Sequence, residues 1–255
     1  MNRRELLKLV GVGGCSAGSF MAAPFLLRCV ASQPSSKEGR ASKPFGFFDV
    51  DSRELNEAGT GLKFRPRVEP LADRLNRMYA VAQKNDVPLV FTTCCSGRML
   101  RPESLPEVLF VPLDPAQRQW EERLDSHRLI CMEKKTYHDA KDNFGCRAYD
   151  MFQGNGNAAR LVQALDVNEW VVFGNGFDLC IYSAVHGLLA AGQKVCLLSD
   201  VFARGARGYY VPTAGGQVEC GTPENLARIL AEFKQLGVRT ATQEQFLASL
   251  SPAGK

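Results

Sequence analysis

With 255 residues, the chain is long enough to bury one substantial hydrophobic core, and a single catalytic domain is the natural expectation. Its hydrophobic fraction of 45% and charged fraction of 23% are those of an ordinary globular protein. The formal net charge of +4 is modest, and neither zinc-finger spacing nor an RNA-binding signature occurs, so we expect no nucleic-acid partner.

The first 31 residues have the layout of an export signal. Arg3 and Arg4 begin a charged start, and a Gly/Ala/Leu-rich stretch and a small-residue region follow. This layout resembles a bacterial twin-arginine signal, which implies the export machinery as a partner and a periplasmic location. The alternative is that the uncleaved segment 1–31 remains as a membrane anchor. Residues 32–43, rich in Ser, Lys and Pro, are predicted to form a flexible linker.

From residue 44 to residue 250, short apolar runs alternate with helical patterns, and 251–255 form a tail. This alternation predicts a doubly wound, mostly parallel α/β sheet with helices on both faces, a Rossmann-like three-layer fold. Six strands are predicted, at 44–51, 88–93, 128–133, 170–175, 194–200 and near Val238. Apolar spacing and capping residues predict helices at 71–82, 159–165 and 178–191 and from Thr222 onward.

Nine cysteines are present, and seven remain if the leader is removed. An odd number leaves at least one thiol outside any intramolecular disulfide. Cys131 and Cys196 lie in apolar strand-like runs and are predicted to be buried as small hydrophobic residues. Cys146 and Cys220 are the expected disulfide formers, with no pairing readable from the sequence.

Three reactive side chains follow predicted strands. Asp51 closes the first strand, Lys134 follows the third and Cys180 follows the fourth. Because the carboxyl ends of parallel strands meet at one edge of a sheet, we expect the three to converge there. Each has a plainer interpretation, as a turn residue, a solvated charge and a core cysteine. Their coincidence favours a site.

The surroundings of Cys180 strengthen this interpretation. The Gly-Asn-Gly turn at 174–176 permits unusual backbone angles, and Asp178 is predicted to cap the helix that follows. Cys180 then lies in the first helical turn, where backbone N–H groups and the helix dipole favour a thiolate and can hold an oxyanion. Strand, tight turn and nucleophile follow the logic of a nucleophile elbow.

The run GNGFDLCIYSAVHGLLAAGQKVCLLSD resembles the nucleophile region of the isochorismatase-like cysteine hydrolases, which include nicotinamidases and carbamoyl-group hydrolases. Gly174, Asp178, Cys180 and Asp200 stand at matching places. The family has a cis peptide where Asn175-Gly176 stands here, so the resemblance suggests a cis bond at this turn.

Two further segments carry the resemblance. FFDVDSRE is similar to the family's Asp-x-Gln segment, which makes Asp51 the matching aspartate and Arg53 a departure from Gln, with Asp49 as an alternative register. MEKKTY is similar to the family's Glu-Lys-x-x-Phe/Tyr, so Lys134 matches the family lysine. The likeness covers most of residues 44–210.

The resemblance implies hydrolysis of a C–N amide-type bond of a small molecule by an Asp51–Lys134–Cys180 triad. Asp51 would take the thiol proton and later deliver it to the leaving amine, and Lys134 would hold the charges and lower the thiol pKa. The backbone N–H groups of Gly176 and Cys180 would form the oxyanion hole. The resemblance also implies a homo-oligomer.

Nicotinamidases bind a metal through an aspartate and histidines between the first two strands. The three histidines here, His127, His138 and His186, lie elsewhere, so we predict no metal and no cofactor. Residues 138–149 are predicted to be an insertion that forms a lid or a subunit contact. Phe177, Tyr137 and Phe152 are candidates for the substrate pocket, with simple packing as the alternative.

Two other functions fit parts of the sequence. Asp49-Val-Asp51 also resembles the start of haloacid-dehalogenase-type phosphatases, in which Thr92 or Thr93 and Lys134 would hold phosphate and Asp200 would bind magnesium. The glycine-rich turn before Cys180 has no role in that scheme. The third possibility is an inactive binding relative that keeps the fold without the substrate pocket.

Overall fold

A computed structural model of the chain describes residues 42–54, 65–66, 69–92, 107–134, 151–204, 210–213 and 216–250. The sequence-predicted export signal 1–31, insertion 138–149 and tail 251–255 lie outside these residues, as does most of the linker 32–43. Within the described part, no helix is both long and apolar enough to cross a membrane.

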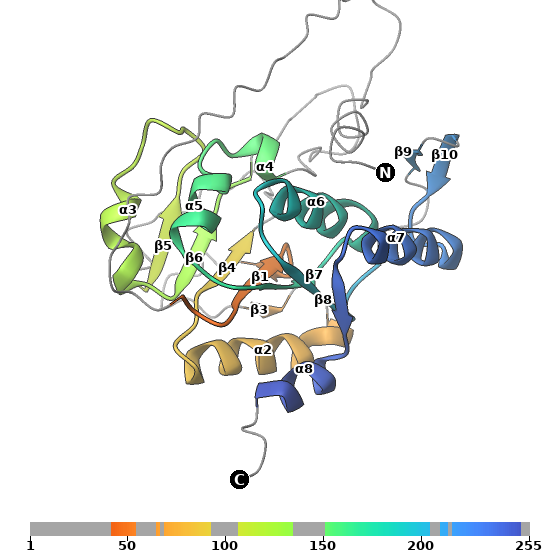
Figure 1. Ribbon diagram of the computed structural model, residues 1–255, viewed down its shortest axis with the longest axis horizontal. Coiled ribbons are helices and arrows are strands. Elements are labelled where there is room, and N and C mark those ends of the chain that lie inside the picture. Colours follow the sequence, from red (N-terminus) through yellow and green to blue (C-terminus); the bar gives the residue numbers. More distant parts are fainter. Residues whose placement is uncertain are drawn as a thin grey trace, which may run out of the picture. The chain divides into compact units, whose positions relative to one another are not determined.

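A parallel sheet of seven strands forms the centre of the fold, in the order β11-β8-β7-β1-β4-β6-β5 (Figure 1). Its strands are β1 (Gly46–Val50), β4 (Leu89–Thr92), β5 (Val108–Val111), β6 (Leu129–Met132), β7 (Trp170–Gly174), β8 (Val195–Phe202) and β11 (Arg239–Ala241). The α/β class and the six predicted strands are confirmed, but the count of six is wrong because β5 was missed. This four-residue strand lies at the sheet edge between Pro106 and Pro112, and edge positions are where strands tolerate proline.

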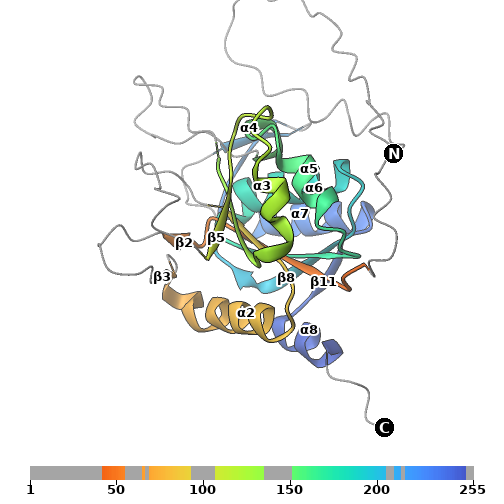
Figure 2. The same cartoon turned by 90° about the vertical axis from the view of Figure 1, so that its left-hand side faces the viewer.

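Helices cover both faces of the sheet, as a doubly wound fold requires (Figures 1 and 2). One face carries α2 (Ala72–Lys84) and α8 (Gln243–Leu250). The other carries α4 (Met151–Gly154), α5 (Ala158–Ala164) and α6 (Tyr182–Ala190). The remaining helices are η1 (Glu69–Leu71), α3 (Trp120–Arg123), η3 (Leu124–Ser126), η4 (Phe177–Ile181) and α7 (Pro223–Gln235). There are also two small two-stranded sheets. One pairs β2 (Arg53–Glu54) with β3 (Arg65–Pro66) in antiparallel orientation, and the other pairs β9 (Tyr210–Thr213) with β10 (Gly216–Glu219).

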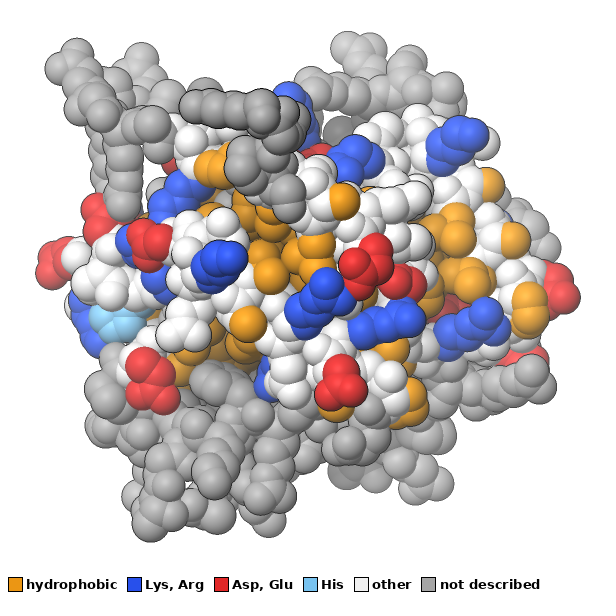
Figure 3. Space-filling model, turned by 90° about the horizontal axis from the view of Figure 1, so that it is seen from below, with side chains coloured by type: hydrophobic (Ala, Val, Ile, Leu, Met, Phe, Trp, Pro, Cys, Tyr) orange, Lys and Arg blue, Asp and Glu red, His pale blue; other side chains and the backbone are white. Residues whose placement is uncertain are grey.

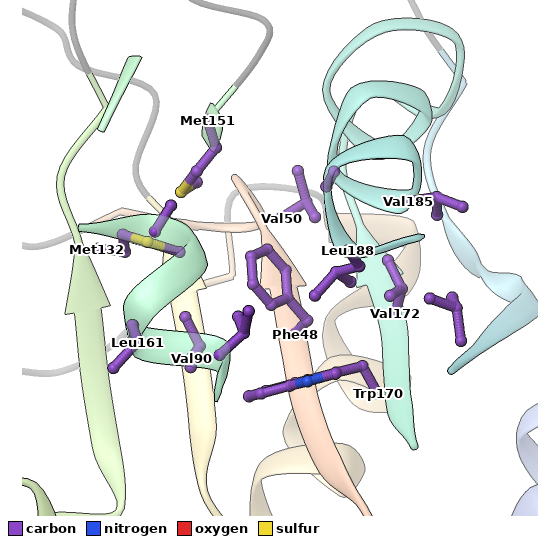
Figure 4. Close-up of a cluster of buried hydrophobic side chains, with 14 of the residues drawn as sticks. Phe48, Val50, Val90, Met132, Met151, Leu161, Trp170, Val172, Val185 and Leu188 are labelled. Atoms are coloured by element: carbon purple, nitrogen blue, oxygen red, sulfur yellow. The ribbon is translucent and has the colours of Figure 1, made fainter. Parts of the chain in front are cut away.

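Apart from Asp49 of β1, the strands β1 and β7 are apolar throughout, because helices bury them on both sides. Phe48 and Val50 of β1 point toward the face of α4, α5 and α6, where they pack with Met132, Trp170 and Leu188 (Figure 4). Their strand neighbour Phe47 points to the other face and meets Phe246 of α8 at 5.8 Å between ring centroids. Each face therefore has its own core, and the sheet separates the two.

The strand order reverses direction at β1. The chain proceeds from β1 to β4 and outward on one side, then returns to place β7 and β8 on the other side. Ligands in open α/β sheets bind beyond the carboxyl ends of the strands at such a reversal. The topology therefore points to the edge shared by β1 and β7 as the place for a site.

The seven-stranded sheet lies within one compact unit, formed by Ser42–Val211 and Val218–Lys255. On the face seen in Figure 3, basic and acidic side chains are intermixed among apolar ones.

The packing of α6 against α4 depends on a glycine. A Cβ atom at Gly187 would lie 2.1 Å from a ring carbon of Phe152, whose ring also stacks on Phe48 at 6.3 Å. Alanine normally favours a helix by about 1 kcal/mol over glycine. Here we expect Gly187→Ala to destabilise the protein by about 1–3 kcal/mol in urea unfolding, because the ring has to move.

A smaller residue at position 152 tests this cause. In the background Phe152→Leu, Gly187→Ala should cost clearly less than in the parent protein. An equal loss of stability in both backgrounds would contradict the steric explanation.

Candidate active site

The carboxyl ends of β1 and β7 are held together by main-chain contacts. Val50 pairs with Gly174, and the Asn175 N–H donates to the Val50 carbonyl oxygen at 2.6 Å. Gly174 has a φ of 130°, and a Cβ there would lie 2.2 Å from that oxygen, so only glycine fits. The residue before Asp51 is thus in direct contact with the turn that leads to Cys180.

Asp51 and Lys134 form a buried ion pair at this edge. The Lys134 ammonium nitrogen lies 2.5 Å from Asp51 Oδ2, and both side chains are at most 2% exposed. The Thr92 hydroxyl donates to Asp51 Oδ1 at 2.7 Å and accepts the Asp51 N–H at 3.0 Å. The interpretation of Lys134 as a solvated surface charge is therefore wrong. Three neighbouring strands, β1, β4 and β6, each supply one member.

An asparagine fixes the segment that carries Lys134. The Asn155 side-chain amide donates to the Glu133 carbonyl oxygen at 2.9 Å, and the Glu133 N–H donates to Val111 at 3.3 Å. Asn155 is 1% exposed. Sequence analysis missed Asn155, and it considered Thr92 as a phosphate ligand alone, because neither has a spacing that points to its partner.

The turn before Cys180 differs from the predicted helix start. Gly176 has a left-handed φ of 74°, and its carbonyl accepts the Ile181 N–H at 3.1 Å, which closes a π-helical turn over Phe177–Ile181 before α6 begins. Such turns occur often at functional sites. The predicted helix 178–191 is thus a π turn followed by α6. The described residues contain no cis peptide, so the suggestion of a cis bond at Asn175-Gly176 is wrong.

Cys180 is a half-buried thiol on this turn. A Cβ atom added at Gly176 would lie 3.5 Å from the Cys180 sulfur, so the backbone of Gly176 stands directly beside the sulfur. Cys180 also packs against the core on the α6 face, the same face toward which Met132 of β6 points. Cys180 thus lies on the turn that follows β7, the strand whose carboxyl end pairs with that of β1, which precedes Asp51.

Asp178 does not cap the helix, contrary to the sequence prediction. Its buried carboxylate accepts the Gly221 N–H at 3.0 Å and the Asn225 side-chain amide at 2.7 Å. These bonds tie the Cys180 turn to the start of α7, where Thr222 caps the helix as predicted. Asn225 is a second residue that sequence analysis missed, since 47 positions separate it from Asp178.

The polar contacts continue between α6 and α7. Glu232 accepts the Tyr182 hydroxyl at 2.8 Å and lies 3.1 Å from His186 Nε2 and 3.2 Å from Arg228. Burial raises the pKa of Glu232, but the hydrogen bonds from His186 and Tyr182 and the charge of Arg228 outweigh it and leave this pKa below its ordinary value. His186 thus interacts with Glu232 of α7.

The aromatic pocket candidates have packing roles where they are described. Phe177 is fully buried and stacks on Phe202 at 4.3 Å between centroids. Phe152 is half-buried against Phe48 and α6. Tyr137 lies outside the described residues.

The other cysteines that the structure describes are buried. Cys131 and Cys196 are 0% exposed, as predicted, and burial raises the pKa of Cys196 to about 12. Cys220 is a buried thiol and not a disulfide partner, contrary to expectation, and burial raises its pKa to about 11. Cys146 lies outside the described residues.

A second buried carboxylate, Asp49, lies on the opposite face of the sheet from Val50. Its Oδ1 accepts the Ser52 hydroxyl, and its Oδ2 accepts the Tyr79 hydroxyl of α2 at 2.8 Å. Burial raises the pKa of Asp49 to about 6, although the hydrogen bonds from Ser52 and Tyr79 and the charge of Arg53 lower it. These contacts support Asp51 over the alternative register at Asp49, because Lys134 pairs with Asp51.

Within the described ranges, no group of three or more His, Cys, Asp or Glu side chains is arranged to hold a metal ion.

No family model and no curated protein matches the chain. Solved structures do match. The pyrazinamidase of Pyrococcus horikoshii in complex with zinc is 16% identical with a TM-score of 0.47, over 78% of this chain and 99% of that one. An isochorismatase-like hydrolase from Alkaliphilus metalliredigens is 16% identical with a TM-score of 0.48, over 82% and 98%. A cysteine hydrolase from Pseudomonas syringae pv. phaseolicola is 14% identical with a TM-score of 0.46, over 80% and 91%.

The buried Asp51–Lys134 pair leads to a testable prediction about the stability of the protein. Removing one partner leaves a buried charge without its counter-charge, so Lys134→Met or Asp51→Asn alone should cost about 3–5 kcal/mol. The double variant should recover part of this loss in urea unfolding. Single losses that simply add in the double variant would contradict a coupled pair.

The raised pKa of Asp49 predicts that the stability of the protein depends on pH. Its pKa is raised from 3.8 to about 6 in the folded protein, so the folded state binds the proton more tightly than the unfolded chain does. The resulting stabilisation is nearly complete at about pH 3 and is lost as pH rises through 6. Asp49→Asn has no such term, so relative to the parent its unfolding free energy should rise by about 3 kcal/mol between about pH 3 and pH 7. A difference that stays constant across this range would contradict the assignment.

Proposed function

We propose that the protein is an isochorismatase-like cysteine hydrolase that cleaves a C–N amide-type bond of a small molecule through an acyl-enzyme on Cys180. The observation that carries the proposal is the buried Asp51–Lys134 pair, which lies next to the β7 turn that bears Cys180. A base, a cation and a thiol at one topological reversal are the groups that nucleophilic cysteine catalysis requires.

The reaction begins with proton transfer from the Cys180 thiol to Asp51. The sulfur then attacks the carbonyl carbon of the substrate and forms a C–S bond, while the carbonyl oxygen takes up negative charge. Collapse of this intermediate breaks the C–N bond, and Asp51 returns the proton to the leaving nitrogen. Water, activated by the same carboxylate, then attacks the thioester and releases the acid and the thiol. Lys134 holds the Asp51 carboxylate in place throughout.

The oxyanion would be held by the main-chain N–H groups of Gly176 and Cys180. The left-handed Gly176 and the π turn after it bring this backbone to the sulfur. Hydrogen-bond donors that are fixed before the reaction stabilise developing charge without reorganising.

The phosphatase alternative receives less support from the geometry. It needs Asp200 beside Asp51 as a magnesium ligand, but the Asp200 carboxylate accepts the Gln243 N–H at 2.7 Å and pairs with Arg74 at 3.2 Å. Both partners belong to the opposite face of the sheet, where α2 and α8 lie. The contacts of Asp200 therefore favour a structural role.

Export by the N-terminal signal, homo-oligomerisation and a lid at 138–149 remain predictions from the sequence. An inactive binding relative also remains an alternative, and turnover distinguishes it from an enzyme.

The decisive test compares cysteine variants on a panel of small primary amides and carbamoyl compounds, with ammonia release as the measurement. Cys180→Ala should lose at least about 10³-fold in kcat, because no acyl-enzyme can form. Asp51→Asn should fall by at least about 10²-fold, because the thiol loses its base.

Cys220→Ala is the control, since it also removes a thiol, a fully buried one, and should keep kcat within about twofold. Mass spectrometry of a rapidly quenched reaction should detect the acyl group on the Cys180 peptide. Normal turnover by Cys180→Ala, or turnover that needs magnesium and resists thiol alkylation, would overturn the proposal.

A further inference from the structure

We propose that Asp49 is a positioning residue that acts through Ser52 and Tyr79 to hold Asp51 in its working geometry on the other face of the sheet. The inference rests on the proposed function, in which Asp51 serves Cys180. Asp49 is a buried carboxylate that takes no part in the steps of the proposed reaction.

The backbone at Asp51 needs such support. Asp51 has a left-handed φ of 50°, which costs a residue with a side chain about 1 kcal/mol or more. This angle turns the chain at the end of β1, where the Asp51 carboxylate meets Lys134 and Thr92. A residue in a strained conformation persists when its neighbours hold it on both sides.

Asp49 and Ser52 hold the two sides of this turn. The Ser52 hydroxyl donates to Asp49 Oδ1, so one hydrogen bond spans Asp51 from the residue after it to the residue two before it. Both side chains are 0% exposed, which protects the bond from competing water. This hydrogen bond therefore closes the turn that carries the Asp51 carboxylate.

Helix α2 anchors the turn. The Tyr79 hydroxyl donates to Asp49 Oδ2 at 2.8 Å, so both carboxylate oxygens of Asp49 accept a hydrogen bond. Arg53 lies with its guanidinium carbon 3.8 Å from the centre of the Tyr79 ring and donates to Asn76 at 3.0 Å. The α2 helix, which lies along this face in Figure 1, thereby fixes the segment on both sides of Asp51. Arg53, the departure from the family Gln, belongs to this anchor.

Among the residues that the structure describes, the charged and titratable groups that act on Asp49 are Tyr79, Arg53 and Asp51. The ionised Asp49 carboxylate is the form that accepts both hydrogen bonds. Since the pKa of Asp49 is raised to about 6, protonation near that pH removes one acceptor and loosens the turn. Positioning by Asp49 should therefore weaken as pH falls through 6.

The experiment reads the site through the Cys180 thiol and needs no substrate. The rate at which iodoacetamide alkylates Cys180 is measured from pH 5 to 9 by mass spectrometry of its peptide, in the full chain and its variants. Asp51→Asn gives the profile of a thiol without its carboxylate partner. We expect Tyr79→Phe and then Asp49→Asn to move the profile progressively toward that of Asp51→Asn, with at least a threefold change in rate at pH 7 for Asp49→Asn.

Tyr182→Phe is the matched control. It also deletes a tyrosine hydroxyl that donates to a carboxylate at 2.8 Å, on Glu232 between α6 and α7. Its alkylation profile should stay within twofold of the parent at every pH, even where its Tm falls as far as that of Tyr79→Phe. A step near pH 6 in the parent profile should be absent from Asp49→Asn. If Asp49→Asn fails to fold, Tyr79→Phe and Ser52→Ala carry the test.

Two results would overturn the proposal and differ in what they reject. Profiles of Asp49→Asn and Tyr79→Phe that coincide with the parent, while Asp51→Asn shifts, reject positioning by Asp49 and leave the proposed function standing. A profile that Asp51→Asn itself does not move rejects the Asp51–Cys180 partnership, and with it both proposals.

Discussion

A buried ion pair is the interaction on which the rest of this site depends. Moving a carboxylate and an ammonium out of water costs several kcal/mol for each ion, and their attraction offsets this cost only when the geometry and the remaining hydrogen bonds are good. Asp51 and Lys134 meet at 2.5 Å, and Thr92 satisfies the other carboxylate oxygen. Apolar residues of similar volume would often stabilise a fold as well or better. The presence of charges here therefore favours a chemical role over a purely structural one.

The site is assembled from two halves on either side of the reversal in strand order. One half is the polar cluster on β1, β4 and β6, and the other is the π turn after β7 with Cys180. Hydrogen bonds from residues distant in the sequence fix each half. Asn155 holds the segment that carries Lys134, and Asn225 holds the Asp178 carboxylate. In the proposed enzyme, such fixed contacts would hold the thiol and its partners within the small tolerances that catalysis needs.

Much of the fold was predictable, because buried parallel strands are continuous apolar runs and helices repeat every 3.6 residues. The positions of Asp51 and Lys134 after their strands also followed from this pattern. The partners of Asp178 did not, since a carboxylate before a helix has the same local sequence whether it caps that helix or bonds to Asn225 on α7. The π turn was unpredictable for a similar reason: the left-handed Gly176 and its bond from Ile181 depend on packing around β8 and α7, not on residue spacing. The strand β5 was missed because its apolar run is only four residues long and lies between two prolines, which weaken the pattern of a strand.

Asp49 and Asp51 show how one strand can give two carboxylates different environments. They stand two residues apart, so regular strand alternation would direct both to the same face of the sheet. The left-handed angle at Asp51 breaks that alternation and brings its carboxylate to Lys134, while Asp49 stays with Tyr79 on the α2 side. The repulsion between the two charges is thereby reduced, and each finds its own donors. A regular strand would place both acids beside α2, away from Cys180. The strained turn is therefore what converts an ordinary strand end into a site.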